Sequence, residues 1–264
     1  YENASKELPL CQASEQMGGV IFDQPTSQQK LLALQKTCLK DLCDFSERFS
    51  QCLYMQALLY GNLNQSLATE LYRELQTILA ANPYSLQSQA KAKVLLLSDL
   101  HGPYKLAFET NRQGAAALLL LQEGPFSFES WAIQQTLGQA LQSAFFETLR
   151  TKQQTAYIAK AWDDEKEKQL LQYFAVQSST HTPTDLLARF ELFLEDFSKN
   201  LPLEISLERF KKIRTSLITS LKMRPENMFN KAIETAKLAF YYQDFAWVNK
   251  QINSLKDLSY NNFC

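Results

Sequence analysis

The apolar residues in the first third of the chain recur mostly at helical spacing. Over residues 26–51, leucines and a phenylalanine return every three or four positions, which predicts one or two helices. Residues 53–63 are apolar and aromatic and end at Gly61-Asn62, a pattern typical of a buried strand that leaves through a turn. Residues 66–81 again place their leucines on one helical face, and Asn82-Pro83 ends that predicted helix.

The middle of the chain changes to short apolar runs separated by turn residues. The runs cover residues 94–97, 104–108 and 115–122, with glycine and proline between them, so we predict three strands. The polar segment before them, residues 83–92, has no clear period and is predicted to be a linker.

Beyond Gly124-Pro125 the pattern predicts a helix and then a hairpin. Ser127 is a suitable N-cap for the helix, whose apolar stripe continues to Arg150. Two strand-like runs follow, residues 155–162 and 170–177, and the charged segment between them is expected to form a solvated loop.

The last third is helical in pattern. A capping box at residues 182–185 begins one predicted helix, Ser206 begins the next, and a further helical pattern covers residues 226–242. Strands with intervening helices, followed by a run of helices, predict an α+β fold with helices packed on one face of a mainly antiparallel sheet.

Composition narrows the class of protein. The chain has 264 residues, 45% of them hydrophobic, which is enough for one large core or two modest ones. With 27 basic and 28 acidic residues, it lacks the basic surface that binds nucleic acid. The apolar run at residues 115–121 is far shorter than the roughly 20 residues of a membrane span, so we expect a soluble protein, periplasmic or cytoplasmic, with no membrane partner.

The usual catalytic and metal-binding patterns are missing. The two histidines, His101 and His181, lie far apart and are interpreted as ordinary loop residues, and the five cysteines are interpreted as small buried or free thiols. There is no His-x-x-Glu-His motif, no glycine-rich phosphate loop and no Gly-x-Ser-x-Gly elbow. An acidic cluster between the hairpin strands is interpreted as a solvated turn; it comprises Asp163, Asp164, Glu165 and Glu167. The sequence therefore contains no self-contained active site, metal site or cofactor site.

One junction nevertheless carries a specific motif. Residues 145–157, FFETLRTKQQTAY, resemble the F-x-x-L-R-T-K-x-Q-x-G-Y signature of the pitrilysin and insulin-degrading enzyme family of zinc metallopeptidases, with Ala156 in place of the glycine. Residues 56–62, QALLYGN, resemble the A-L-x-x-G-N strand and turn of the same family. Weaker similarity extends over roughly residues 25–260. The resemblance is to the C-terminal half of these peptidases.

The resemblance implies a domain plan. Such enzymes have four related α+β domains in two halves that close on an internal chamber, with zinc bound in the N-terminal domain. Residues 1–82 are then the C-terminal part of a third domain, residues 83–92 a linker, and residues 93–264 a fourth domain, whose last strand is expected beyond Cys264. The full-length protein is expected to be a zinc metalloendopeptidase. This fragment is expected to bind no zinc and to be inactive by itself.

The resemblance also implies two site residues. Arg150 and Tyr157 are expected to reach the substrate beside the zinc and to donate hydrogen bonds to peptide carbonyls, which makes the N-terminal catalytic half and peptide substrates the expected partners. Without the resemblance, Arg150 is a cation at a helix C-terminus and Tyr157 an amphipathic strand residue. The alternative function is that of a non-catalytic member of the same fold, acting in peptide binding or protein assembly.

Overall fold

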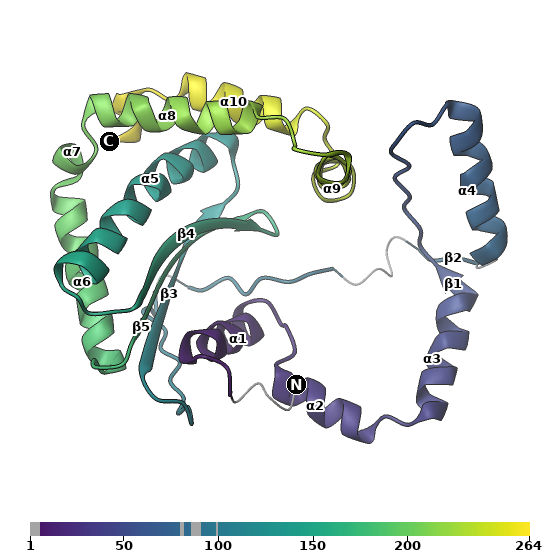
Figure 1. The fold of residues 1–264 in the computed structure, drawn as a ribbon, viewed down its shortest axis with the longest axis horizontal. Helices are drawn as coiled ribbons and strands as arrows, with labels where there is room; N and C mark the ends of the chain where they lie inside the picture. Colours follow the sequence, from purple (N-terminus) through teal and green to yellow (C-terminus); the bar gives the residue numbers. More distant parts are fainter. Residues whose placement is uncertain (1–5, 80–81, 86–90, 99) are drawn as a thin grey trace. The chain divides into compact units, whose positions relative to one another are not determined.

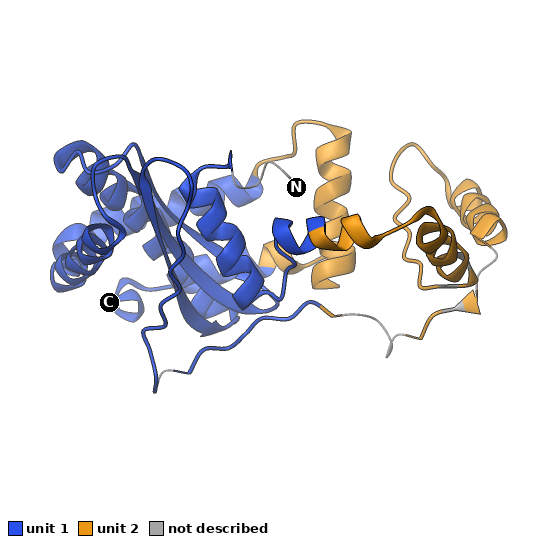
Figure 2. Cartoon of the chain, turned by 90° about the horizontal axis from the view of Figure 1, so that it is seen from below, with its two compact units in different colours: residues 1–31, 92–222, 250–264 blue, residues 32–91, 223–249 orange. Residues whose placement is uncertain are grey.

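The computed structural model describes residues 6–79, 82–85, 91–98 and 100–264, coloured along the sequence in Figure 1. The chain divides into two compact units, drawn in different colours in Figure 2. Unit 1 comprises residues 1–31, 92–222 and 250–264, and unit 2 comprises residues 32–91 and 223–249.

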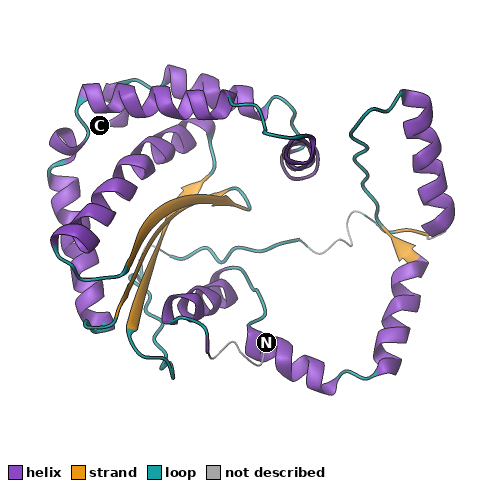
Figure 3. Ribbon diagram, in the orientation of Figure 1, coloured by secondary structure: helices purple, strands orange, loops and turns teal. Residues whose placement is uncertain are grey.

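A three-stranded antiparallel sheet is the centre of unit 1 (Figure 3). Its order is β3 (Ala115–Pro125), β5 (Gln169–Ser178) and β4 (Ile158–Lys166), with a register shift in β3 between Gln122 and Gly124. The central strand β5 is buried from Leu170 to Ser178 because it has a neighbour on each edge and a layer on each face. The sheet and its helices confirm the predicted α+β class.

One face of the sheet carries the main hydrophobic core. Helices α5 (Phe128–Phe146) and α6 (Pro183–Lys199) cover this face, and α8 (Leu207–Lys222) packs on α5. The ring of Phe145 lies 5.2 Å from that of Phe174, 5.5 Å from Phe190 and 5.2 Å from Phe193, between centroids. Aromatic burial of this extent supplies a large share of the stability of a domain. Three C-terminal helices complete the layer: α7 (Leu201–Glu204), α10 (Trp247–Asp257) and α11 (Tyr260–Phe263).

The opposite face of the sheet meets helix α1 (Pro9–Ile21), which contacts β3 and β5 (Figure 1). An extended segment near residue 95 joins this layer: the Leu95 N–H donates to the Ile21 carbonyl at 2.7 Å, and the Leu97 N–H donates to Gln122 Oε1 at 2.9 Å. The predicted strands at residues 94–97 and 104–108 are therefore wrong, since their described residues do not pair with a strand.

Unit 2 is mostly helical. It contains the second half of α2 (Ser27–Lys36), then α3 (Leu39–Gln51) and α4 (Gln65–Leu79), and from the C-terminal segment α9 (Met228–Ala236) with the π-helix η4 (Lys237–Tyr242). The strands β1 (Cys52–Leu53) and β2 (Asn82–Pro83) form a short parallel pair. The predicted strand over residues 53–63 is thus wrong beyond its first residue, because only that end finds a partner.

The helix predictions are confirmed almost throughout. Ser127 accepts from the Ser130 N–H as the N-cap of α5, and Thr182 and Asp185 form the predicted capping box of α6. Half of the predicted linker, residues 86–90, lies outside the described residues, and the domain boundaries at residues 82 and 93 stay a prediction. Within the part of the chain that the structure describes, we find no helix long and apolar enough to cross a membrane.

Candidate active-site segment

The segment with the peptidase-like motif forms the end of α5 and the turn into β4. After Phe146 the helix widens into a π-helix, η3 (Glu147–Lys152), whose Leu149 is buried. The turn closes where the Gln153 N–H donates to the Thr148 carbonyl and the Thr155 N–H donates to the Leu149 carbonyl, both at 3.0 Å. π-Helical turns are rare in proteins, and those that occur are frequently found at functional sites.

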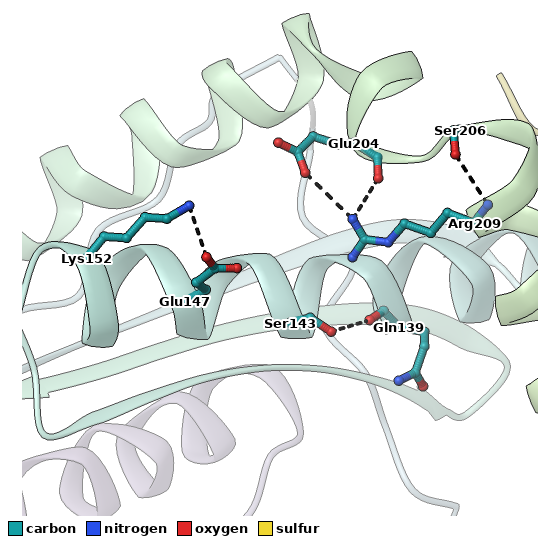
Figure 4. A network of polar contacts seen from close by, with 7 residues as sticks. All are labelled: Gln139, Ser143, Glu147, Lys152, Glu204, Ser206 and Arg209. Atoms are coloured by element: carbon teal, nitrogen blue, oxygen red, sulfur yellow. Dashed lines mark hydrogen bonds and ion pairs between the residues drawn. The ribbon is translucent and has the colours of Figure 1, made fainter.

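Polar contacts lie along α5 and η3 and, separately, at the start of α8 (Figure 4). Lys152 Nζ lies 3.2 Å from Glu147 Oε1 within η3. Nearby, Arg209 of α8 donates through Nη1 to the Glu204 carbonyl at 2.7 Å. Both ion-paired groups of η3 are exposed, so their contribution to stability is small.

Arg150 is exposed on η3. Its guanidinium carbon lies 5.2 Å from the centre of the Phe146 ring, a cation–π distance. Among the residues that the structure describes, the guanidinium has no hydrogen bond or ion pair with another side chain or carbonyl. Its donors are therefore available to a ligand.

Tyr157 stands at the last position before β4 and is 46% exposed. Its N–H donates to the Gln177 carbonyl at 3.2 Å, and its hydroxyl accepts a hydrogen bond from Gln177 Nε2. Gln177 itself is completely buried, and its Oε1 accepts from the Leu10 N–H at 2.9 Å. The Tyr157 hydroxyl is thus hydrogen-bonded to a buried amide, while the residue as a whole is about half exposed to solvent.

A second set of polar contacts braces the turn between Arg150 and Tyr157. Arg189 of α6 donates through Nη1 to Gln153 Oε1 at 2.6 Å, and its Nη2 lies 3.4 Å from His181 Nε2. The Ser178 hydroxyl donates to the Thr155 carbonyl at 2.6 Å. These contacts tie the turn to α6 and to the end of β5, so its shape does not depend on the turn residues alone.

The structure places Arg150 and Tyr157 on one short segment, and both residues are exposed. No contact joins the two side chains among the described residues. Gln177, Arg189 and His181 support the segment and were not selected from the sequence. A glutamine inside the apolar run of β5 was the available signal, because a buried amide needs partners for both its oxygen and its nitrogen.

The interpretation of the acidic cluster as a solvated turn is wrong for most of its members. Residues 163–166 are paired within β4, and the turn consists of Glu167 and Lys168, both with positive φ (50° and 60°). Asp163 lies partly buried beside α5, where Gln135 Nε2 donates to it. Burial raises the pKa of the Asp163 carboxyl, and the charge of Asp164 adds to the rise, while the hydrogen bond from Gln135 opposes it.

The described residues do not offer a zinc site. None of their His, Cys, Asp and Glu side chains form a group of three or more that could hold a metal ion. His101 is exposed, and His181 contacts Thr180 and Arg189. Four cysteines are free and exposed: Cys11, Cys38, Cys43 and Cys264.

Known proteins similar to this chain are peptidases. Residues 136–236 match the family model for PQQ synthase PqqF-like proteins, C-terminal lobe domain 4. The chain is 24% identical over 204 residues to Protease 3 of Salmonella typhi, covering 77% of this chain and 21% of that protein. It is 24% identical over 256 residues to the A-factor-processing enzyme of Saccharomyces cerevisiae, covering 95% of this chain and 24% of that protein.

Solved structures show the same fold. The crystal structure of pitrilysin matches with a TM-score of 0.78 at 21% identity, over 99% of this chain and 28% of that chain. The peptidase M16 inactive domain from Pseudomonas fluorescens matches with a TM-score of 0.62 at 12% identity, over 98% of this chain and 62% of that chain.

These matches show that the chain is similar to M16-type peptidases and to pitrilysin. More narrowly, they indicate a C-terminal part of such a peptidase, which confirms the resemblance predicted from residues 145–157. The chain spans about a fifth to a quarter of the length of the curated relatives it matches.

Proposed function

We propose that this chain is the C-terminal, non-zinc-binding portion of a zinc-dependent metalloendopeptidase that degrades peptides in a closed chamber. In this proposal residues 1–82 end a third domain, residues 93–264 form the fourth, and residues 83–92 link them. Zinc and the residues that hold it belong to the N-terminal catalytic half, which is the partner of this chain.

The exposed residues Arg150 and Tyr157 carry the proposal. Among the described residues, the Arg150 guanidinium has no hydrogen-bond acceptor, so its donors are open to a substrate. The backbone of Tyr157 is hydrogen-bonded to β5, which positions its phenol side chain. Both side chains donate to oxygen, and a positioned donor stabilises the negative charge that develops on a peptide carbonyl during hydrolysis. One good donor is worth about 3 kcal/mol in such a transition state.

The test is complementation with a zinc-bearing half. This chain is mixed with the separately expressed N-terminal half of its own reading frame, and cleavage of a fluorogenic peptide is measured. Tyr157→Phe is expected to lower kcat by about tenfold or more, since it removes the phenol hydroxyl and keeps the ring. The matched control is Tyr104→Phe, which removes an exposed hydroxyl that donates to the Ser98 carbonyl at 3.3 Å and is expected to leave kcat unchanged. An unchanged rate for Tyr157→Phe would refute the assignment.

The non-catalytic alternative is supported by the fold likeness to the inactive domain from Pseudomonas fluorescens. The two functions predict different sequences upstream of this chain and in its partner proteins. A His-x-x-Glu-His motif upstream, or in a partner protein that co-purifies with this chain, favours the peptidase. If neither source carries the motif and the mixture cleaves no peptide, the chain is a binding or assembly subunit.

A further inference from the structure

A buried side-chain amide links the exposed phenol of Tyr157 to helix α1. Gln177 is 0% exposed and lies near the end of β5, where it is the backbone partner of Ile158, the residue after Tyr157. Its side chain joins two groups: Oε1 accepts from the Leu10 N–H at 2.9 Å, and Nε2 donates to the Tyr157 hydroxyl. The same residue also accepts the Tyr157 N–H through its main-chain carbonyl at 3.2 Å.

Chemistry fixes the orientation of this amide. The oxygen and nitrogen of a glutamine side chain are close in shape and are assigned by their hydrogen-bond partners. A backbone N–H can only donate, so the atom facing Leu10 must be the amide oxygen. The atom facing the phenol is then the NH₂ group, which can only donate.

The phenol has one hydrogen to donate and lone pairs to accept with. Because the Gln177 NH₂ group donates to the Tyr157 oxygen, that oxygen is the acceptor in this contact. The hydroxyl hydrogen of Tyr157 must therefore point away from Gln177. Tyr157 is 46% exposed, and in the proposed function a ligand accepts that hydrogen. An acceptor at position 177 would do the reverse, since it would take the phenol hydrogen and leave only lone pairs for a ligand.

We propose that Gln177 is a positioning residue that fixes Tyr157 as a hydrogen-bond donor toward the substrate. The inference rests on the proposed role of Tyr157 in peptide hydrolysis. It makes the docking of α1 part of the site, because the Leu10 N–H is what holds the Gln177 amide in the required orientation.

A purely structural role for Gln177 predicts different behaviour. Leu10 is in the first turn of α1, where backbone N–H groups lack partners within the helix, and the N-cap residue Leu8 supplies no side-chain cap. In a purely structural role, the one task of the Gln177 side chain is to accept the hydrogen bond from the Leu10 N–H. A carboxylate would satisfy it equally well and would favour the positive end of the helix dipole.

Gln177→Glu separates the two roles because the shapes are nearly equal and only the hydrogen-bonding polarity changes. The carboxylate accepts from the Leu10 N–H and also from the Tyr157 hydroxyl, which captures the phenol hydrogen. In the mixture with the zinc-bearing half, we expect kcat to fall by about tenfold or more, approaching Tyr157→Phe, with KM within about twofold. Added to Tyr157→Phe, the substitution should cause no further loss.

The matched control is Gln122→Glu on β3. Gln122 also bridges two groups through its amide, accepting from the Leu97 N–H at 2.9 Å and donating to the Leu95 carbonyl at 2.7 Å, but no phenol is involved. This variant is expected to keep kcat unchanged. If Gln177→Glu behaves like the control while Tyr157→Phe is slow, the inference is overturned and the proposed function stands. If Tyr157→Phe is itself fully active, the proposed function fails first.

If the buried charge of Gln177→Glu prevents folding, a measurement on this chain alone tests the inference without that variant. In ¹⁵N-labelled protein, Tyr157→Phe removes the acceptor of the Gln177 NH₂ group, so we expect the Gln177 side-chain resonances to shift and those of Gln122 to stay. Unmoved Gln177 resonances would overturn the inference whatever the activity.

Discussion

Replacing Asp163 by Asn is expected to stabilise the fold at neutral pH. Two oxygens lie near Gly138 of α5: a Cβ placed on Gly138 would lie 2.6 Å from Asp163 Oδ1 and 3.5 Å from Gln172 Oε1. Gln172 is 1% exposed, and its Oε1 has no hydrogen-bond partner within the described structure. Neither oxygen can donate to the other while the carboxyl is ionised.

The substitution supplies the missing donor. The Asn carbonyl can still accept from Gln135, and its NH₂ group is expected to donate to the Gln172 oxygen. Satisfying one buried acceptor is worth about 1 kcal/mol, and removing the partly buried charge adds to it. We therefore expect the free energy of unfolding to rise by about 1–2 kcal/mol at pH 7, which for a chain of this size raises Tm by roughly 3–6 °C.

The pH dependence identifies the cause. The pKa of Asp163 is raised in the folded protein above its ordinary value of 3.8, with burial as the largest cause. Burial also raises the pKa of Glu123, and the negative charge of Asp163 adds to that rise. A raised folded pKa contributes stability that is complete below pH 3.8 and is lost as the pH rises through the folded pKa. The advantage of Asp163→Asn should therefore be present at pH 7 and vanish toward pH 3.8.

Urea unfolding followed by circular dichroism, at several pH values between these limits, measures the effect. Asp164→Asn is the control because Asp164 is exposed, and its removal is expected to change stability by less than about 0.5 kcal/mol. A lower stability of Asp163→Asn at pH 7, or an equal gain at every pH, would refute the reasoning.

Two further predictions concern the core and a helix cap. Phe145→Ala removes the ring at the centre of the contacts with Phe174, Phe190 and Phe193 and is expected to cost about 3–5 kcal/mol in urea unfolding, whereas Phe229→Ala, at a side chain that is 72% exposed, should cost little. Thr182→Ala removes the hydroxyl that accepts from the Asp185 N–H and should cost about 1 kcal/mol by the same assay. A loss no larger than that of the exposed Thr184→Ala would show that the cap does not stabilise α6.

The candidate site was predictable only where it is contiguous in the sequence. Arg150 and Tyr157 are seven positions apart in one motif, so a sequence pattern selects both, and the comparisons confirm the family that the motif indicates. Gln177 and Arg189 reach the same turn from β5 and α6, and no local pattern connects them to it. Their roles depend on strand register and on the packing of α6.

Helices and their caps were determined by the sequence itself, since a helix forms its hydrogen bonds within one segment. The N-cap of α5 and the capping box of α6 are local arrangements of a few residues, and both were predicted at the correct positions. Strands need a partner that is distant in sequence. Residues 94–97 have a strand-like composition but bond to the end of α1 and to a side chain of β3, which only the tertiary structure decides.

The same distinction explains the polar groups. The sequence determined that Asp163 is acidic and that Gln177 lies in an apolar run, and no more. Pairing of β4 with β5 from Ile158 to Lys166 turns Asp163 toward α5 and brings Gln177 beneath Tyr157. Burial raises the pKa of Asp163, and hydrogen-bond partners set the orientation of the Gln177 amide. Both effects depend on neighbours that only folding brings together.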